Sequence, residues 1–176
     1  MMHPGPGCDP TPVAMQTSLH AFMPSSVSEA AGDAIAACVP GTVFCHSVDG
    51  TLALGAGVAR DAKKKWGRPG RPGGAEDLEP GTALLQTTPA GATVAHLVCN
   101  RIYWVKEGPG TYLPALEAAL RDAVAKLARS GVDKPAFVCP RIGCDLDRQA
   151  WPDVRAVLER VGRDTEARFT VYTPAS

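Results

Sequence analysis

The sequence lacks several features that would assign it to a common class of protein. Its 176 residues carry 18 basic and 18 acidic side chains, so no excess of charge would attract nucleic acid or an anionic membrane surface. No apolar run approaches the roughly 20 residues that a transmembrane helix needs, and residues 1–12 contain proline and glycine where a signal peptide has an apolar segment. We therefore expect an intracellular protein, cytoplasmic or nuclear, that is monomeric and has neither a membrane partner nor a direct nucleic-acid partner.

Zinc-binding and disulfide patterns are also missing. Six cysteines are present, but no two form a C-x-x-C pair and none has a companion histidine at zinc-ligand spacing. Most of them lie in apolar runs, which is typical of buried free thiols in a reducing compartment. His46 lies on a predicted buried strand and is expected to be a core residue whose ring nitrogens have hydrogen-bond partners, rather than a metal ligand. The sequence thus predicts no metal site and no cofactor.

The sequence does contain a pattern of strands alternating with helices. Residues 1–16 are rich in proline and glycine and are expected to form a disordered or weakly attached leader, while residues 17–176 are enough for one domain. A hairpin is predicted around residues 89–91, and apolar spacings of three and four predict helices at 111–130 and from residue 151. Further strands are expected at 17–23, 42–48, 136–140 and 168–173, with a helix after the glycines at 55–57. Together they predict an α/β fold, a three-layer α/β/α sandwich around a central mixed sheet.

Two glycine-bearing loops follow predicted strands and precede predicted helices. They are L-G-A-G-V-A at 54–59 and R-I-G-C-D-L-D at 141–147. Glycine lets the backbone approach a phosphate and direct consecutive N–H groups at it, so two such loops side by side would hold a diphosphate. The full G-x-G-x-x-G fingerprint is absent, however, and a tight turn explains G-A-G without a ligand. Asp147 also has an ordinary explanation, because aspartate before a helix is most often an N-cap.

Several separated segments resemble one family. The segment at 32–67, the N-R-I-Y-W and T-Y elements, P-R-I-G-C-D-L-D-R-Q-A-W and the terminal T-V-Y-T-P together resemble a macrodomain, nearest to the terminal ADP-ribose protein glycohydrolase branch and its bacterial and phage relatives. The match runs over most of residues 32–174, and the linked pattern is far more specific than any one piece. The resemblance implies a macrodomain at 17–176, with ADP-ribose or ADP-ribosylated protein as its partner.

The resemblance also implies roles for individual residues. In this family an aspartate near the start contacts adenine, two glycine-bearing loops hold the diphosphate and the distal ribose, and an aspartate in the second loop serves in catalysis. The catalytic residue here would be Asp147. Tyr172 is a further candidate for the pocket lining, with packing an equally good explanation. The ligand-binding residues would be Asp33, Gly55, Ala56, Gly57, Val58, Ala59, Arg141, Ile142, Gly143, Cys144, Asp145, Leu146 and Tyr172.

Two positions depart from the family pattern. The branch typically carries a lysine nucleophile in a T-K element before R-Y-W, and the corresponding residues here are Cys99 and Asn100, whose amide cannot attack a ribose carbon. Lys106 would reach the site only if the V-K-E-G-P-G loop folds back. Asp145 stands where the family usually has glycine, so its carboxylate would repel a diphosphate unless it points to solvent. The backbone at Asp145 would also be strained if its φ is positive.

These residues leave three functions open. The leading hypothesis is an ADP-ribose-binding hydrolase of ADP-ribosyl esters, on modified Glu or Asp side chains or on O-acyl-ADP-ribose. In it Asp147 acts with water as a general base or an electrostatic stabiliser. The alternative is a non-catalytic reader of ADP-ribose, which Asn100 and Asp145 favour. A third is phosphatase action on ADP-ribose-1″-phosphate, as in other macrodomains.

Overall fold

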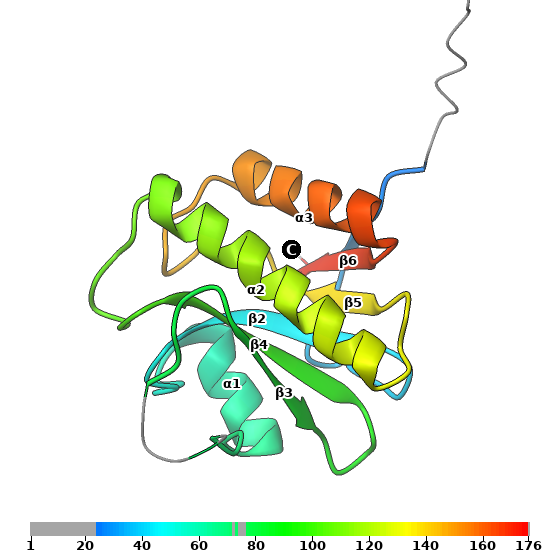
Figure 1. Ribbon diagram of the computed structural model, residues 1–176, viewed down its shortest axis with the longest axis horizontal. Coiled ribbons are helices and arrows are strands. Elements are labelled where there is room, and N and C mark those ends of the chain that lie inside the picture. The colour runs from blue at the N-terminus through cyan, green and yellow to red at the C-terminus, as the bar shows by residue number, and fades with distance from the viewer. Residues whose placement is uncertain (1–23, 72, 74–76, 176) are drawn as a thin grey trace, which may run out of the picture.

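The structure is a computed structural model that describes residues 24–71, 73 and 77–175. In this part of the chain a six-stranded sheet forms the middle layer, with one helix on one face and two on the other (Figure 1). The strands are β1 (Val27–Ala31), β2 (Val43–Asp49), β3 (Ala83–Thr87), β4 (Thr93–Asn100), β5 (Ala136–Cys139) and β6 (Arg168–Thr173), and the helices are α1 (Gly57–Trp66), α2 (Pro109–Arg129) and α3 (Trp151–Thr165). The predicted three-layer α/β/α sandwich is confirmed.

The sheet is mixed, with the strand order β1-β6-β5-β2-β4-β3. Within the described residues, β3 and β4 form the only antiparallel pair, and they are the predicted hairpin. The other pairs are parallel, so β2, β4 and β5 all end at one edge of the sheet. The loops that follow these three strands therefore lie together at that edge, where open α/β sheets bind ligands.

The strand β1 is the one that the sequence does not predict. The strand expected at 17–23, like the leader at 1–16, falls outside the described residues. β1 pairs in parallel with β6, from Val27 opposite Phe169 to Ala31 opposite Thr173. It is an edge strand of small and polar residues in which Val27 alone is buried, so it lacks the apolar alternation that signals a strand.

Three clusters of apolar side chains occur in the described part of the chain. The largest lies between the sheet and the pair α2 and α3, and it includes Phe137 and Phe169, whose rings stack with centroids 5.0 Å apart. A second lies under α1, where Trp66 packs on Phe44. The third is formed by Val48, Leu52, Leu54, Leu84 and Val98. None of the helices described combines the length and the apolar character that crossing a bilayer requires.

A row of buried polar side chains links β2, β4 and β3 on the α1 side. Gln86 donates from Nε2 to the Trp66 carbonyl at 3.0 Å, so its Oε1 accepts from His96 Nε2 at 2.9 Å. His96 Nδ1 must then accept from His46 Nε2, which is 2.8 Å away. The prediction that His46 is a satisfied core residue is correct for Nε2 but wrong for Nδ1, which is buried without a partner among the described residues. Burial lowers the pKa of His46 well below its ordinary value and the pKa of His96 to about 4.

The loop after β5 rests on the first turn of α2. Tyr112 is fully buried there, and a Cβ added at Gly143 would lie 2.4 Å from its hydroxyl oxygen. Gly143 also has a φ of +71°, which L-residues with a side chain rarely adopt. Glycine is therefore required at this position for both space and backbone conformation, and burial raises the pKa of the Tyr112 phenol well above its ordinary value.

The two buried histidines make stability depend on pH. Their folded-state pKa lies below the value of about 6.5 in an unfolded chain, so the unfolded state takes up protons first as the pH falls. We expect the free energy of unfolding to decrease between about pH 6.5 and about pH 4, by about 3 kcal/mol from His96 alone. Urea denaturation of the wild type and of His96→Gln across this range measures the effect, because glutamine does not titrate. The same change in the free energy of unfolding with pH in both proteins would contradict this prediction.

Replacement of Gly143 tests the packing of its loop. We expect Gly143→Ala to lower the free energy of unfolding by about 1–3 kcal/mol. The added methyl group would clash with the Tyr112 ring, and alanine is strained at the positive φ of this position. Gly110→Ala is the matched control, since a Cβ there has no atom within 4 Å. Thermal or urea denaturation compares the three proteins. Gly143→Ala as stable as Gly110→Ala would show that the loop relaxes freely.

Candidate functional site

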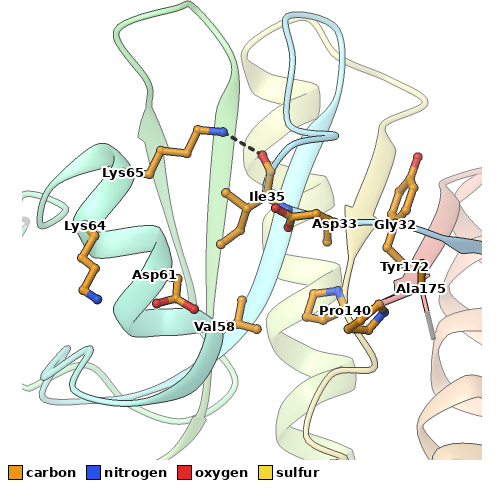
Figure 2. A pocket seen from close by; sticks show the side chains of 12 residues that line it. Gly32, Asp33, Ile35, Val58, Asp61, Lys64, Lys65, Pro140, Tyr172 and Ala175 are labelled. Carbon is orange, nitrogen blue, oxygen red and sulfur yellow. Dashed lines mark hydrogen bonds between the residues drawn. The ribbon is translucent and has the colours of Figure 1, made fainter.

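A cavity of about 650 Å³ opens at the sheet edge where β2, β4 and β5 end. Its walls are the loop and first turn at 53–59, the loop after β4 and the loop after β5. We call it the Asp147 cavity. A second cavity of about 800 Å³, the Asp33 cavity, is shown in Figure 2. It adjoins the Asp147 cavity, because Val58 and Pro140 line both. We call the two adjoining cavities together the cleft; residues of α1 and of the loop after β5 line both of them.

Most of the predicted site residues come together in this cleft. Asp33 and Tyr172 line the Asp33 cavity, whereas Asp147 lines the other one. Cys144 lines neither cavity; it packs against the larger apolar cluster, and its thiol lies 3.5 Å from the Ile142 carbonyl oxygen. The predicted site residues that line the Asp147 cavity are Gly55, Ala56, Gly57, Val58, Ala59, Arg141, Ile142, Gly143, Asp145, Leu146 and Asp147.

Asp147 lies at the centre of a set of polar contacts. Its Oδ1 accepts a hydrogen bond from Asn100 Nδ2 at 2.9 Å and lies 3.6 Å from Lys106 Nζ. Its Oδ2 accepts from Ser47 Oγ at 3.4 Å. The Asp147 side chain is 15% exposed, so the carboxylate reaches the cavity while its position is fixed by groups from β2, β4 and the loop after β4. A carboxylate held in this way can act on a ligand as a base or as a negative charge.

The interpretation of Asp147 as a helix cap is wrong. The N-cap of α3 is Ala150, and no side chain caps this helix. The chain between them turns at Arg148, whose φ is +55°. The carboxylate of Asp147 therefore points to the cavity and is free for another role.

The loop after β4 folds back over the site, which is the condition given above for Lys106 to reach it. Gln149 holds it there, because its Nε2 donates to the carbonyl oxygens of Glu107 at 3.1 Å and Asp147 at 3.0 Å. The sequence reasoning missed both Gln149 and Ser47. Neither carries a signal in the sequence, because a single polar residue beside a motif or on a buried strand is common.

Asp145 does not have the strained backbone considered above. The non-glycine residues with positive φ among those described do not include it, and the tight turn is made at Gly143 and Arg148 instead. The Asp145 side chain lies at the exposed edge of the cavity. Its carboxylate can therefore turn to solvent.

The two glycine-bearing loops touch. A Cβ added at Gly57 would lie 3.1 Å from Leu146 Cδ1, and Gly57 has a φ of +52°. The first turn of α1 begins at this contact with no capping side chain and no acidic residue. Its free N–H groups and the positive end of the helix dipole are thus available to an anion in the cleft.

Arg141 is engaged at the surface. Its Nη2 lies 2.9 Å from Glu29 Oε2, and its guanidinium lies 5.2 Å from the centre of the Trp151 ring. Arg155 and Trp151 also donate to Glu29. The hydrogen bond from Arg141 lowers the pKa of the Glu29 carboxyl below its usual value. These contacts join β1 to the loop after β5 and to α3, so they hold one wall of the cleft.

The lining of the Asp33 cavity combines apolar residues with two carboxylates, Asp33 and Asp61, and two lysines, Lys64 and Lys65. Asp33 Oδ1 accepts from the Ile35 backbone N–H at 2.8 Å, which leaves its second oxygen for a ligand. Figure 2 shows side chains of α1 facing Asp33, Pro140 and Tyr172 across the cavity. Lys65 closes its outer side by donating to the Ile35 carbonyl at 3.2 Å. A flat group with a polar edge fits between such walls.

Known proteins share this sequence pattern and fold. The chain is 29% identical to ADP-ribose glycohydrolase OARD1 of Homo sapiens over 154 residues, which are 85% of this chain and 92% of that protein. Its structure is similar to the macrodomain of Mycobacterium tuberculosis DarG, with a TM-score of 0.64 and 14% identity over 85% of this chain and 98% of that one. It is also similar to Thermosipho africanus DarTG in complex with ADP-ribose, with a TM-score of 0.61 and 18% identity over 84% of this chain and 41% of that one. No protein-family model matches the chain.

The similarity in sequence and the similarity in structure point to the same fold. The chain has the macrodomain fold, and its sequence is similar to that of ADP-ribose glycohydrolase OARD1.

Proposed function

We propose that the cleft binds ADP-ribose and that the protein hydrolyses ADP-ribosyl esters. The adenine would lie in the Asp33 cavity, the diphosphate at the first turn of α1 between the two glycine loops, and the distal ribose in the Asp147 cavity. The observation that carries the proposal is the carboxylate of Asp147, which is held by three side chains at the end of this cleft. The similarity to OARD1, named an ADP-ribose glycohydrolase, and to DarTG in complex with ADP-ribose supports it.

The groups around Asp147 suit an ester better than other linkages. In an ADP-ribosyl ester the leaving group is the carboxylate of a Glu or Asp side chain, or of a small acyl group. Such a carboxylate is a weak base, with a pKa of about 4, so it departs without a strong general acid. The imidazoles of His46 and His96 are buried, and burial lowers the pKa of both, so they are poor proton donors at neutral pH.

The proposed step is attack of water on the anomeric carbon of the distal ribose. The water oxygen forms a bond to this carbon, the carbon–oxygen bond to the carboxylate breaks, and the water proton passes to Asp147. Asn100 orients Asp147 and cannot itself attack, because its amide nitrogen is not nucleophilic. Lys106, which is paired with Asp147, supplies a positive charge beside the departing carboxylate.

A non-catalytic reader of ADP-ribose is the second candidate. It is favoured by Asn100, which stands where the glycohydrolase branch has a lysine and which uses its amide N–H on Asp147. In a reader the same contacts would fix Asp147 as an acceptor for the ribose hydroxyls. The proposed location, in the cytoplasm or nucleus, and the monomeric state rest on sequence features alone.

Binding is tested by calorimetry with ADP-ribose, compared with AMP and NAD. We expect ADP-ribose to bind in the micromolar range, at about −8 kcal/mol. Asp33→Ala should weaken binding by about 1–3 kcal/mol, because the adenine amino group loses its acceptor. Asp33→Asn is the matched control for the turn, since its Oδ1 can still accept from the Ile35 N–H. If both variants bind ADP-ribose like the wild type, adenine does not lie against Asp33. If the wild type does not bind ADP-ribose at millimolar concentration, both the hydrolase and the reader hypotheses are wrong.

Catalysis is tested at Asp147. We expect Asp147→Ala to lower the release of ADP-ribose from glutamate-modified protein by about 10²–10⁴-fold, while the affinity for ADP-ribose changes by a small factor. Asp133→Asn is the matched control, because it removes an exposed carboxylate that lines neither cavity and should leave the rate intact. Asn100→Lys should raise the rate by placing an amine beside Asp147. If the wild type releases no ADP-ribose while the Asn100→Lys variant does, the hydrolase hypothesis is wrong and the reader hypothesis remains. If Asp147→Ala keeps full activity, the catalytic residue is not Asp147.

A further inference from the structure

Exposed apolar side chains gather beside the Asp147 cavity. Six large hydrophobic residues are exposed in the described chain, and four of them are Tyr103, Trp104, Val105 and Leu146. Tyr103, Trp104 and Leu146 line the cavity, and Val105 follows Trp104 in the chain. We call these four residues the aromatic rim. Scattered single apolar residues are ordinary on a protein surface, whereas a group of them at the mouth of a cavity marks an interaction site.

The two aromatic rings of the rim are not explained by packing in the core. Tyr103 and Trp104 are 58% and 64% exposed, and their rings meet edge to face with centroids 4.8 Å apart. Each ring thus supports the other while its outer surface stays in water. Large amphipathic rings of this kind are typical of surfaces that bind another molecule at low cost in side-chain entropy.

The rim lies where a group attached to the distal ribose would leave the cleft. It shares the loop after β4 with Lys106, whose ammonium group is 3.6 Å from Asp147. On the other side Leu146 directly precedes Asp147 in the loop after β5. If the distal ribose lies against Asp147, as proposed above, whatever is esterified to it must pass the aromatic rim. The rim therefore meets the leaving group rather than ADP-ribose.

The charges near the rim favour a polypeptide over a nucleic acid. The two segments that carry the rim, 101–108 and 145–148, contain three cations, Arg101, Lys106 and Arg148, and three carboxylates, Glu107, Asp145 and Asp147. Arg101 is also paired with Glu79 at 3.0 Å. A phosphodiester chain needs an excess of positive charge, which this balance does not supply. A polypeptide with apolar side chains needs only the apolar surface.

We propose that the aromatic rim binds the polypeptide segment that carries the ADP-ribosyl group, with apolar residues next to the modified carboxylate. This inference rests on the proposed function and adds to it a surface that contacts the polypeptide on either side of the modified residue. The protein would then prefer modified polypeptides to free ADP-ribose and to small esters such as O-acetyl-ADP-ribose. The preference would come from contacts of the rim with the chain on either side of the modified residue.

The test compares two affinities, so that it does not depend on catalysis. One ligand is free ADP-ribose. The other is a short peptide in which a glutamate between apolar residues carries ADP-ribose through a non-hydrolysable amide. We expect the wild type to bind the modified peptide about tenfold more tightly than ADP-ribose, and the variant Tyr103→Ser/Trp104→Ser to bind the two about equally. Val132→Ser, which changes an exposed apolar residue outside the rim, should keep the tenfold ratio.

The outcomes separate this inference from the function on which it rests. A wild type that binds ADP-ribose but shows no preference for the peptide overturns the inference alone, and so does a preference that survives in the rim variant or disappears in Val132→Ser. A rim-dependent preference for an oligonucleotide with ADP-ribose on a base, and none for the peptide, overturns it in favour of a nucleic-acid substrate. Failure of the wild type to bind free ADP-ribose is the distinct result that sinks the proposed function, and the inference falls with it.

Discussion

The parallel pairing of β2 with both β4 and β5 is the constraint on which the site depends. Because these three neighbouring strands run in one direction, their ends at Asp49, Asn100 and Cys139 meet at one edge of the sheet. The loops that leave this edge supply the free N–H groups at α1, the rim residues and Lys106, and the carboxylate of Asp147. The backbone hydrogen bonds of the sheet thus bring together loops that are up to about a hundred residues apart in the chain, independently of side-chain contacts.

The site also holds the polar atoms that the fold leaves unpaired. Among the described residues, the buried side-chain atoms without a hydrogen-bond partner are His46 Nδ1, Asn100 Oδ1 and the Tyr112 hydroxyl. His46 and Asn100 line the Asp147 cavity, and Tyr112 lies under Gly143, which lines it too. Unpaired buried groups cost about 1–3 kcal/mol each, and native proteins keep few of them. Their concentration at one place is typical of a site at which function has been favoured over stability.

Periodicity and turn chemistry predicted the helices and most strands, because these elements carry their own signals. In α2 the apolar residues Leu116, Leu120 and Leu127 repeat at helical spacing, and the hairpin of β3 and β4 surrounds Gly91. β1 carries no such signal, since an exposed edge strand is stabilised by its partner β6 rather than by burial of its own side chains. The same limit applies to Ser47 and Gln149, whose roles arise only from what lies next to them in space.

The sequence by itself determined that two glycine loops follow strands, and the macrodomain resemblance named Asp147 within the second of them. It left open whether Asp147 caps α3 or faces a ligand, whether Asp145 is strained, and whether Lys106 reaches the site. The tertiary structure decided these points: Ala150 is the cap, the positive φ falls at Arg148, and Lys106 pairs with Asp147. The physical reason is that a motif fixes local backbone geometry, whereas the direction of a side chain depends on partners that only the folded sheet brings within hydrogen-bonding distance.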